Sequence, residues 1–257
     1  MSHARPHPRR GTKIECRHED DIDSAHHQVF NVGVKRTLWR ALLRLRFVLW
    51  QHRRHDRLVL ETSLGFPLVV LPRVFNPAIF RSTPVALAAL AGEPIQPDHR
   101  VLDIGTGSGV LAVSAAQRSR RVVAVDVNPE AVRCARINAT LNTVDDRIDV
   151  RPGDLFEAVA DERFSLIVCN PPFYRGDAGT DFDQALVSPD FAERLAAGID
   201  NHLDADGRAL VVLSSEGDEA GFLASFQDAG LAVETALHRD LVSEIVTVHR
   251  LCRPDRR

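Results

Sequence analysis

Between Arg100 and Leu251, short apolar runs of strand length alternate with longer segments of helical periodicity, and this alternation limits the possible folds more than any other feature of the chain. Chains that alternate in this way form mostly parallel sheets with helices on both faces. We therefore predict an α/β domain built on a seven-stranded, mostly parallel sheet. Strands are expected at residues 100–104, 121–126, 148–151, 164–169, 209–213, 231–237 and 244–251. Helices are expected at residues 109–118, 129–142, 189–201 and 219–228.

The region upstream of this alternation divides into parts of different character. Residues 1–34 have almost no apolar periodicity and are expected to form a flexible leader. Residues 35–74 predict an extension: a helix over 35–56, either packed on the main domain or acting as a lid, and then a hairpin around Ser63-Leu64-Gly65. Residues 75–257 are expected to form the main domain. Its first helix is predicted from Ser82-Thr83-Pro84, with a hydroxyl N-cap and a proline in the first turn, to a stop at Gly92.

Composition and charge exclude several classes of protein. The apolar runs fall far short of the roughly 20 residues of a membrane-spanning helix, and no signal-peptide pattern follows the N-terminus, so a cytoplasmic protein is expected. The four cysteines and eleven histidines lack metal-ligand spacing, so no metal is expected. Residues 1–60 hold 13 Lys/Arg and 6 Asp/Glu (13 − 6 = +7), and the rest holds 19 and 29 (19 − 29 = −10). This basic arm on an acidic body either faces an anionic partner such as RNA or is solvated or internally paired.

Three glycines follow the predicted strand 100–104 directly, in the segment Gly105-Thr106-Gly107-Ser108-Gly109. Glycine lets the backbone turn sharply and approach a ligand closely, because it lacks a Cβ atom and adopts positive φ. The next strand ends in Asp126, about 20 residues further on, where a carboxylate can accept hydrogen bonds from a ribose diol. Asp103, just before the glycines, is badly placed for a pyrophosphate and suits an ammonium group. These features predict a site for a nucleoside.

Four motifs follow one another in the order DIGTGSG, AVDVNPEAV, GDLF and NPPF. In this order they resemble the motifs of class I S-adenosylmethionine-dependent methyltransferases, and the resemblance covers roughly residues 75–251. The resemblance implies a Rossmann-like fold and S-adenosylmethionine as the cofactor. It also implies that Asp126 holds the ribose and that Asp154 and Leu155 lie beside the adenine. The residues that it places at the amino-acid part of the cofactor are Asp103, Gly105, Thr106, Gly107 and Gly109, and Asn170 is expected beside the cofactor as well.

The predicted strand 164–169 carries Asn170-Pro171-Pro172-Phe173 to the carboxyl edge of the sheet, where open α/β folds bind ligands. Both prolines have a fixed φ and restrict the residue before them, so the Asn170 side chain and the Pro171 carbonyl are held rigidly. Two such acceptors can localise the lone pair of a planar amino or amide nitrogen, while Phe173 offers a face for stacking. We predict these four residues to be catalytic, acting by positioning and fixed dipoles without a strong general base.

The tetrapeptide resembles the (Asn/Asp)-Pro-Pro-(Tyr/Phe) signature of amino-methyltransferases, which act on glutamine amides, adenine N6 and guanine N2. Residues 66–77 are similar to the corresponding segment of release-factor glutamine methyltransferases and related "methyltransferase small" domains, although Ala78-Ile79-Phe80-Arg81 stands where those carry acidic residues. Phe173-Tyr174-Arg175-Gly176 is more similar to ribosomal RNA guanine-N2 methyltransferases. The expected substrate is a protein glutamine-type side chain, with an RNA base or a small molecule as alternatives. A cofactor-binding regulatory subunit is the non-enzyme alternative, and the intact NPPF motif argues against it.

Overall fold

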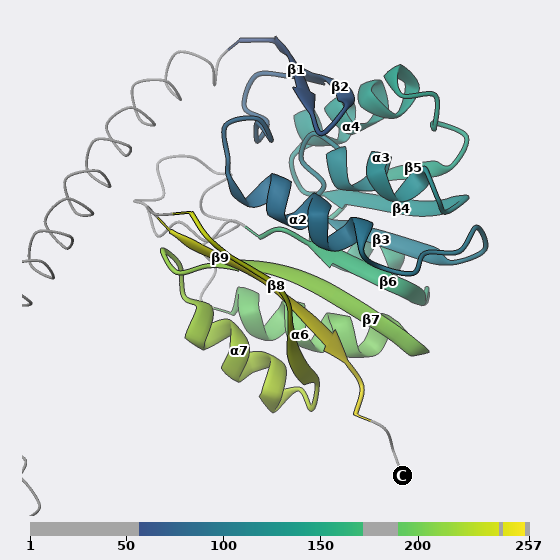
Figure 1. Ribbon diagram of the computed structural model, residues 1–257. Helices are drawn as coiled ribbons and strands as arrows, with labels where there is room; N and C mark the ends of the chain where they lie inside the picture. The colour runs from purple at the N-terminus through teal and green to yellow at the C-terminus, as the bar shows by residue number, and fades with distance from the viewer. Residues whose placement is uncertain (1–56, 172–189, 242–243, 255–257) are drawn as a thin grey trace, which may run out of the picture. The chain divides into compact units, whose positions relative to one another are not determined.

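The central element of the fold is a seven-stranded sheet (Figure 1). A computed structural model describes residues 57–171, 190–241 and 244–254, so the expected leader over 1–34 and the expected helix over 35–56 lie outside the described residues. The strands of the sheet are β3 (Arg100–Ile104), β4 (Arg121–Asp126), β5 (Ile148–Pro152), β6 (Phe164–Cys169), β7 (Leu203–Ser214), β8 (Ala232–Asp240) and β9 (Ile245–Cys252). Their order is β5-β4-β3-β6-β7-β9-β8. The first five run parallel and β9 runs antiparallel to both its neighbours, which confirms the predicted α/β sheet.

Helices cover both faces of this sheet. Helices α2 (Ser82–Ala91), α3 (Val110–Ala116) and α4 (Pro129–Leu141) lie on one face, and α6 (Phe191–His202) and α7 (Glu219–Asp228) lie on the other (Figure 1). A short 3-10 helix, η1 (Glu157–Val159), follows β5. Each strand feeds both cores, because successive side chains point to opposite faces. In β4, for example, Val122 and Ala124 belong to the first core, whereas Val123 and Val125 belong to the second.

The predicted hairpin is present and docks on α4. Its strands β1 (Val59–Ser63) and β2 (Phe66–Val70) pair antiparallel around a turn in which Leu64 and Gly65 have positive φ. The buried side chain of Asn138 on α4 accepts a hydrogen bond from the Val69 N–H (2.7 Å) and donates one to the Val69 carbonyl (2.8 Å). An asparagine amide thus continues the hydrogen-bonding pattern of β2 onto a helix, and the hairpin is fixed to the main domain.

Two local predictions differ from the structure. Helix α2 begins at Ser82, as expected, but its N-cap is Arg81, and no side chain caps the helix, so the predicted hydroxyl cap is wrong. Strand β7 begins at Leu203 rather than residue 209. Its first residues read as a loop because they include Asp204, Asp206 and Gly207, yet Leu203 pairs with Phe164 across a register shift between β6 and β7. Tertiary pairing here overrides a local preference for a turn.

Several expectations concern what is absent. Among the described residues, no helix has the length and apolar character needed to cross a membrane. The same part of the chain holds no group of three or more His, Cys, Asp or Glu side chains arranged for a metal ion. Its cysteines Cys134, Cys169 and Cys252 are all free.

Candidate active site

A pocket opens at the carboxyl ends of β3, β4, β5 and β6, where the sequence places the candidate site. Most of the predicted residues line it. These are Gly105, Thr106, Gly107, Asp126, Asp154, Leu155, Asn170 and Pro171. Asp103 and Gly109 do not line the pocket but lie at the two ends of the glycine turn. The predicted catalytic residues Pro172 and Phe173 lie outside the described residues.

The glycine turn is fixed to the end of β4 by main-chain and side-chain hydrogen bonds. The N–H groups of Gly105 and Thr106 donate to the Val125 carbonyl at 2.9 and 3.0 Å. Asp126 Oδ2 accepts from the Gly107 N–H at 2.8 Å, and burial raises the pKa of this carboxyl. Gly105 has a φ of 67°, and a Cβ atom built on it meets nothing within 4 Å. The turn therefore needs glycine there for its backbone conformation, and the space beside it is open to a ligand.

Asp103 is buried and stabilises the glycine turn through hydrogen bonds. Its Oδ2 accepts hydrogen bonds from Thr106 Oγ1 (2.7 Å) and from the Ala112 N–H (3.1 Å) in the first turn of α3. Its Oδ1 is buried and has no hydrogen-bond partner in the described residues. Burial raises the pKa of Asp103 to about 7, and the nearby Asp126 carboxylate acts in the same direction. A cation brought to Oδ1 would restore the ionised form.

Gly109 serves the packing of two helices. It has a φ of 82°, and a Cβ atom at this position would lie 3.0 Å from both Cα and Cβ of Ala135 on α4. The third glycine of the motif thus lets α3 begin in contact with α4. Its contribution to the pocket is indirect, because it determines where α3 and the preceding turn lie.

The far end of the pocket is formed after β5. Asp154 Oδ2 accepts a hydrogen bond from Arg194 Nη2 of α6 at 2.5 Å, and both side chains are about a third exposed. The next residue, Leu155, is buried and has a φ of 49°, a conformation that a non-glycine side chain adopts only under constraint. Apolar surface from Leu155 and from Phe191 of α6 lines this end of the pocket.

Asn170 and Pro171 form the wall beside the glycine turn, because Gly105 and Asn170 directly follow the paired residues Ile104 and Cys169 of β3 and β6. Asn170 Nδ2 donates to Ser82 Oγ of α2 at 3.5 Å, whereas Asn170 Oδ1 is buried without a partner in the described residues. The thiol of Cys169 lines the same pocket, and burial raises its pKa, so it stays protonated. The amide oxygen of Asn170 is therefore an uncommitted hydrogen-bond acceptor on this wall.

Sequence reasoning missed several residues of the pocket. Phe75, Thr83 and Phe191 line it, and the Thr83 Oγ1 atom is buried and has no partner in the described residues. Phe75 stacks on Phe80 with ring centroids 3.9 Å apart, which shapes the segment before α2. The sequence could have indicated Thr83, since it belongs to the pair of hydroxyl residues at the start of α2, but such a pair is also typical of a helix cap. No pattern in the sequence indicates Phe191.

The pocket fits the cofactor that the sequence implies. Among the described residues, four buried side-chain polar atoms lack a partner: two belong to Thr83 and Asn170, which line the pocket, and a third belongs to Asp103, at the start of the glycine turn. Buried polar atoms are normally paired, so such a group points to a ligand that completes them. Asp103 Oδ1 suits an ammonium group, the Asp126 carboxylate can still accept from a ribose diol, and Leu155 and Phe191 offer apolar surface for a base.

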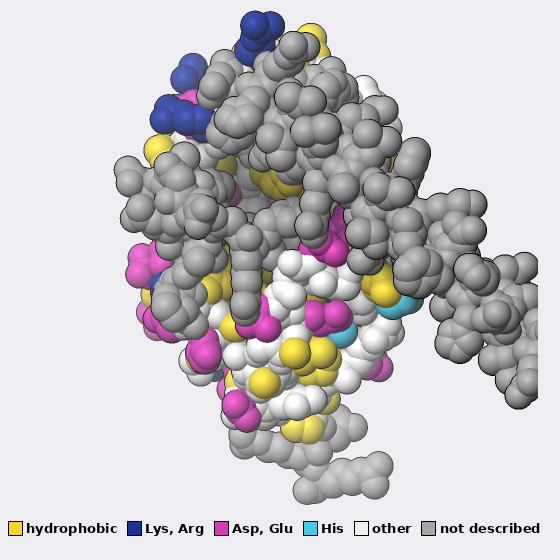
Figure 2. All heavy atoms as spheres, turned by 90° about the vertical axis from the view of Figure 1, so that its left-hand side faces the viewer, with side chains coloured by type: hydrophobic (Ala, Val, Ile, Leu, Met, Phe, Trp, Pro, Cys, Tyr) yellow, Lys and Arg dark blue, Asp and Glu magenta, His cyan; other side chains and the backbone are white. Residues whose placement is uncertain are grey.

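The pocket edge of the sheet is acidic. Its segments, taken as residues 72–83, 105–109, 127–130, 153–157, 190–194 and 215–219, contain three basic residues, Arg73, Arg81 and Arg194. Their acidic residues are Glu130, Asp154, Glu157, Asp190, Glu193, Glu216, Asp218 and Glu219. Figure 2 looks onto this side of the molecule, and Asp and Glu side chains are spread over its middle and lower parts, while most Lys and Arg side chains gather at the top. This surface is suited to a partner without a high density of negative charge.

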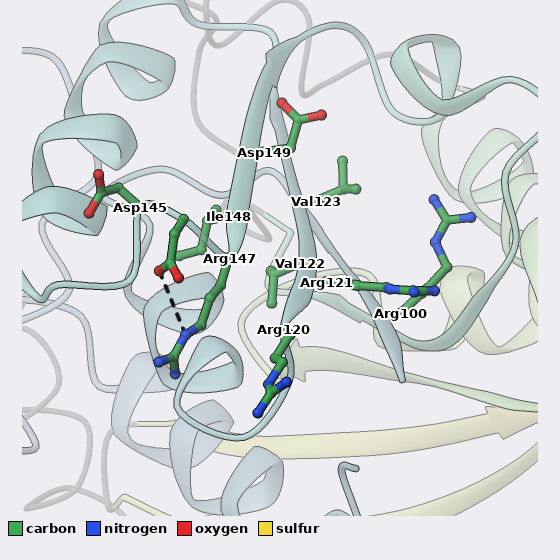
Figure 3. A pocket seen from close by; sticks show the side chains of 10 residues that line it. Arg100, Arg120, Arg121, Val122, Val123, Asp145, Arg147, Ile148 and Asp149 are labelled. Carbon is green, nitrogen blue, oxygen red and sulfur yellow. Dashed lines mark ion pairs between the residues drawn. The ribbon is translucent and has the colours of Figure 1, made fainter. Parts of the chain in front are cut away.

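A second hollow lies at the opposite, amino edge of the sheet. The side chains of Arg100, Arg120, Arg121 and Arg147 surround it (Figure 3), and Arg100 and Arg121 are direct partners in the pairing of β3 and β4. Asp145, Asp146 and Asp149 line it too, and Arg147 Nε lies 3.7 Å from Asp146 Oδ1. Within the described part of the chain, none of the unpartnered buried atoms lines this hollow. The chemistry predicted from the sequence therefore belongs to the carboxyl edge.

Comparison with known proteins identifies the family of the chain. The family model described as the methyltransferase small domain matches residues 70–235. The chain is 42% identical over 101 residues to a tRNA1(Val) (adenine(37)-N6)-methyltransferase of Porphyromonas gingivalis, covering 35% of this chain and 39% of the relative. It is 33% identical over 156 residues to a ribosomal protein uL3 glutamine methyltransferase of Bordetella pertussis, covering 55% and 51%. The chain thus spans between a third and about half of the length of these relatives.

The fold also matches solved structures. A 16S rRNA N2 G1207 methyltransferase of T. thermophilus, in complex with AdoMet and guanosine, superposes with a TM-score of 0.59 at 24% identity, covering 77% of this chain and 50% of that one. This likeness supports the Rossmann-like fold. Because the family model covers more than half of the chain, the protein belongs to the methyltransferase small domain family.

Proposed function

We propose that this protein transfers a methyl group to the planar nitrogen of a protein glutamine-type side chain. The observation that carries the proposal is Asn170 Oδ1, a buried amide oxygen without a partner in the described residues, on the wall of the pocket that holds the glycine turn. An acceptor in this position matches a substrate that presents an N–H group, because the N–H would satisfy the orphaned oxygen.

The chemistry follows from these groups. When bound, S-adenosylmethionine supplies a methyl group on a positively charged sulfur. An amide nitrogen is a weak nucleophile because its lone pair is delocalised into the carbonyl. Asn170 Oδ1 and the Pro171 carbonyl would accept hydrogen bonds from its N–H groups and would orient the nitrogen toward the methyl group of the bound cofactor. Transfer of the methyl group to this nitrogen would release a proton to solvent and would give the N-methylamide and S-adenosylhomocysteine.

Charge favours a polypeptide substrate over a nucleic acid. The segments around the pocket carry eight carboxylates against three arginines, and this excess of negative charge repels a phosphate backbone and attracts a basic polypeptide. The relatives include a ribosomal protein glutamine methyltransferase by name from Bordetella pertussis, matched over 156 residues, and a tRNA adenine-N6 methyltransferase by name from Actinobacillus pleuropneumoniae, matched over 154, so alignment length does not separate the two substrates. The charge around the pocket therefore supports the glutamine-type side chain as the first substrate.

An RNA base is the second candidate. It is supported by the relative from Porphyromonas gingivalis, a tRNA adenine-N6 methyltransferase by name, and by the basic arm over residues 1–60. In this alternative the arm supplies the phosphate contacts that the acidic pocket edge does not, and the base amino group takes the place of the amide beside Asn170.

The experiment is a labelling assay on extract from cells that lack the gene. The purified protein and methyl-labelled S-adenosylmethionine are added, and the labelled material is treated with protease or with ribonuclease. Protease-sensitive label that yields N-methylglutamine on hydrolysis is the expected result. Ribonuclease-sensitive label would replace the first candidate with the second, and label in small molecules alone would overturn both.

A further inference from the structure

Ser82 is buried at the first position of α2, and its hydroxyl is the one hydrogen-bond partner of the Asn170 side chain among the described residues. The two residues are 88 positions apart in the sequence, and Asn170 Nδ2 donates to Ser82 Oγ at 3.5 Å. Helix α2 has no side-chain cap, so this hydroxyl does not accept a hydrogen bond from the N–H groups of its own helix. A residue of the type that usually caps a helix is directed at the candidate catalytic residue instead.

The orientation of an asparagine amide decides what it can do. One end is an acceptor and the other carries two donor hydrogens, and a rotation of 180° about the last side-chain bond exchanges them. A substrate N–H needs the oxygen, since an NH2 group in its place would set two donors against each other. In the structure Nδ2 faces Ser82 Oγ, and Oδ1 is the end left without a partner in the described residues.

The position of Ser82 is itself well determined. Helix α2 packs on α3 and on strands β7, β9 and β8, so it covers the β8 end of the sheet. The segment before it is fixed by the stacked rings of Phe75 and Phe80 and by a turn in which Asn76 Oδ1 accepts from the Ala78 N–H at 3.0 Å. This is the segment in which the sequence departs from the release-factor glutamine methyltransferase pattern. The departure coincides with a serine directed at Asn170.

We propose that Ser82 is a positioning residue for the methyl transfer: it holds the Asn170 amide with Oδ1 toward the acceptor nitrogen. The inference rests on the proposed function, because it takes Asn170 as the residue that receives the substrate N–H. It assigns Ser82 no contact with the substrate. Its effect is expected on kcat and only weakly on cofactor binding.

The kinetic test is a double-mutant cycle with label incorporation into the protein fraction of the extract as the measured rate. Ser82→Ala should lower kcat about tenfold, Ser82→Thr should keep most of the rate, and the affinity for S-adenosylhomocysteine should stay within about twofold. In an Asn170→Asp background, Ser82→Ala should change the rate by less than about twofold, because the two carboxylate oxygens are equivalent and either can accept. Ser225→Ala, which removes a hydroxyl bonded to a helix carbonyl on α7, is the matched control and should leave the rate unchanged.

A second measurement does not depend on turnover. In 15N-labelled protein, the side-chain NH2 signals of Asn170 are assigned by their loss in Asn170→Asp, and their exchange with solvent should be faster in Ser82→Ala. If Ser82→Ala lowers the rate equally in the wild-type and Asn170→Asp backgrounds, or leaves the exchange unchanged, the inference is overturned. A wild-type rate in Asn170→Ala would instead overturn the proposed function, so the two failures are distinguishable.

Discussion

The two edges of the central sheet are both hollowed, but they differ in how their polar groups are satisfied. At the carboxyl edge, Asn170 Oδ1 and Thr83 Oγ1 are buried, without partners in the described residues, beside a turn held open by glycine. At the amino edge, Arg100 pairs with Glu162 and Arg147 with Asp146, and both arginine side chains are more than a third exposed. Among the described residues, one unpartnered buried atom, His99 Nδ1, lies next to this edge, but it does not line the hollow. An exposed charge is solvated by water and is common on protein surfaces, whereas burying a polar atom without a partner is unfavourable in free energy. Buried polar atoms without partners therefore indicate a ligand site better than exposed charges do.

The largest expected difference between the two edges is in the effect of Asn170→Ala on methyl transfer. Removing the orphaned acceptor should lower methyl transfer by at least about a hundredfold, while the affinity for S-adenosylhomocysteine stays within about threefold. The control at the opposite edge is Arg121→Ala, which should change neither quantity. Label incorporation and isothermal titration calorimetry measure the two. Comparable losses in both variants would show that the edges do not differ in function.

The next effect concerns cofactor affinity. Asp126→Ala removes both the proposed ribose acceptor and the partner of the Gly107 N–H, so S-adenosylhomocysteine should bind about 30-fold more weakly or worse. Asp149 on β5 is the control, because it is an exposed carboxylate paired with Arg151 at the edge strand. Calorimetry on Asp149→Ala should give the wild-type affinity. An unaltered affinity in Asp126→Ala would remove this residue from the cofactor site.

A third prediction tests why the turn needs its last glycine. Gly109→Ala combines a positive φ with a clash against Ala135, and it should lower the free energy of unfolding by about 2 kcal/mol and Tm by about 4–8 °C. Gly230→Ala has a similar φ of 78° but nothing within 4 Å of the new Cβ, so it should cost only about 1 kcal/mol. Thermal unfolding of the two variants separates the effect of the positive φ from the effect of the clash with Ala135. Equal losses would mean that contact between α3 and α4 is not the constraint.

The smallest effect is the pH dependence of cofactor binding. Burial raises the pKa of Asp103 to about 7 in the ligand-free protein, and an ammonium group at Oδ1 favours the ionised form. Below that pH, binding of S-adenosylmethionine therefore requires Asp103 to lose its proton. The affinity for S-adenosylmethionine should fall by up to about tenfold per pH unit as the pH is lowered from about 7 to about 6. In Asp103→Asn the affinity should be weaker and nearly independent of pH in this range. A flat profile in the wild type would exclude Asp103 as the ammonium partner.

Prediction from sequence was most successful where a local pattern and the tertiary structure agree. The bounds of β3, β4 and β6 are those expected, because each is a mostly apolar run that ends at Asp or is followed by Gly or Asn. The start of β7 was not predicted, since its aspartates and Gly207 favour a turn and only pairing with β6 extends it. Likewise Asp154 was expected beside a base, and the structure adds an ion pair with Arg194 that no spacing in the sequence indicates.

The sequence by itself determined the α/β alternation, the glycine turn and the residues that end each parallel strand, because these depend on neighbours in the chain. Parallel strands bring their carboxyl ends together, so the convergence of Asp126, Asp154 and Asn170 at one edge could also be predicted. Only the tertiary structure decided which hydroxyl lies at Asn170, and that Thr83 and Phe191 complete the pocket. Those contacts depend on how α2 and α6 pack against opposite faces of the sheet, and packing is set by volume and shape across the whole core rather than by a local pattern.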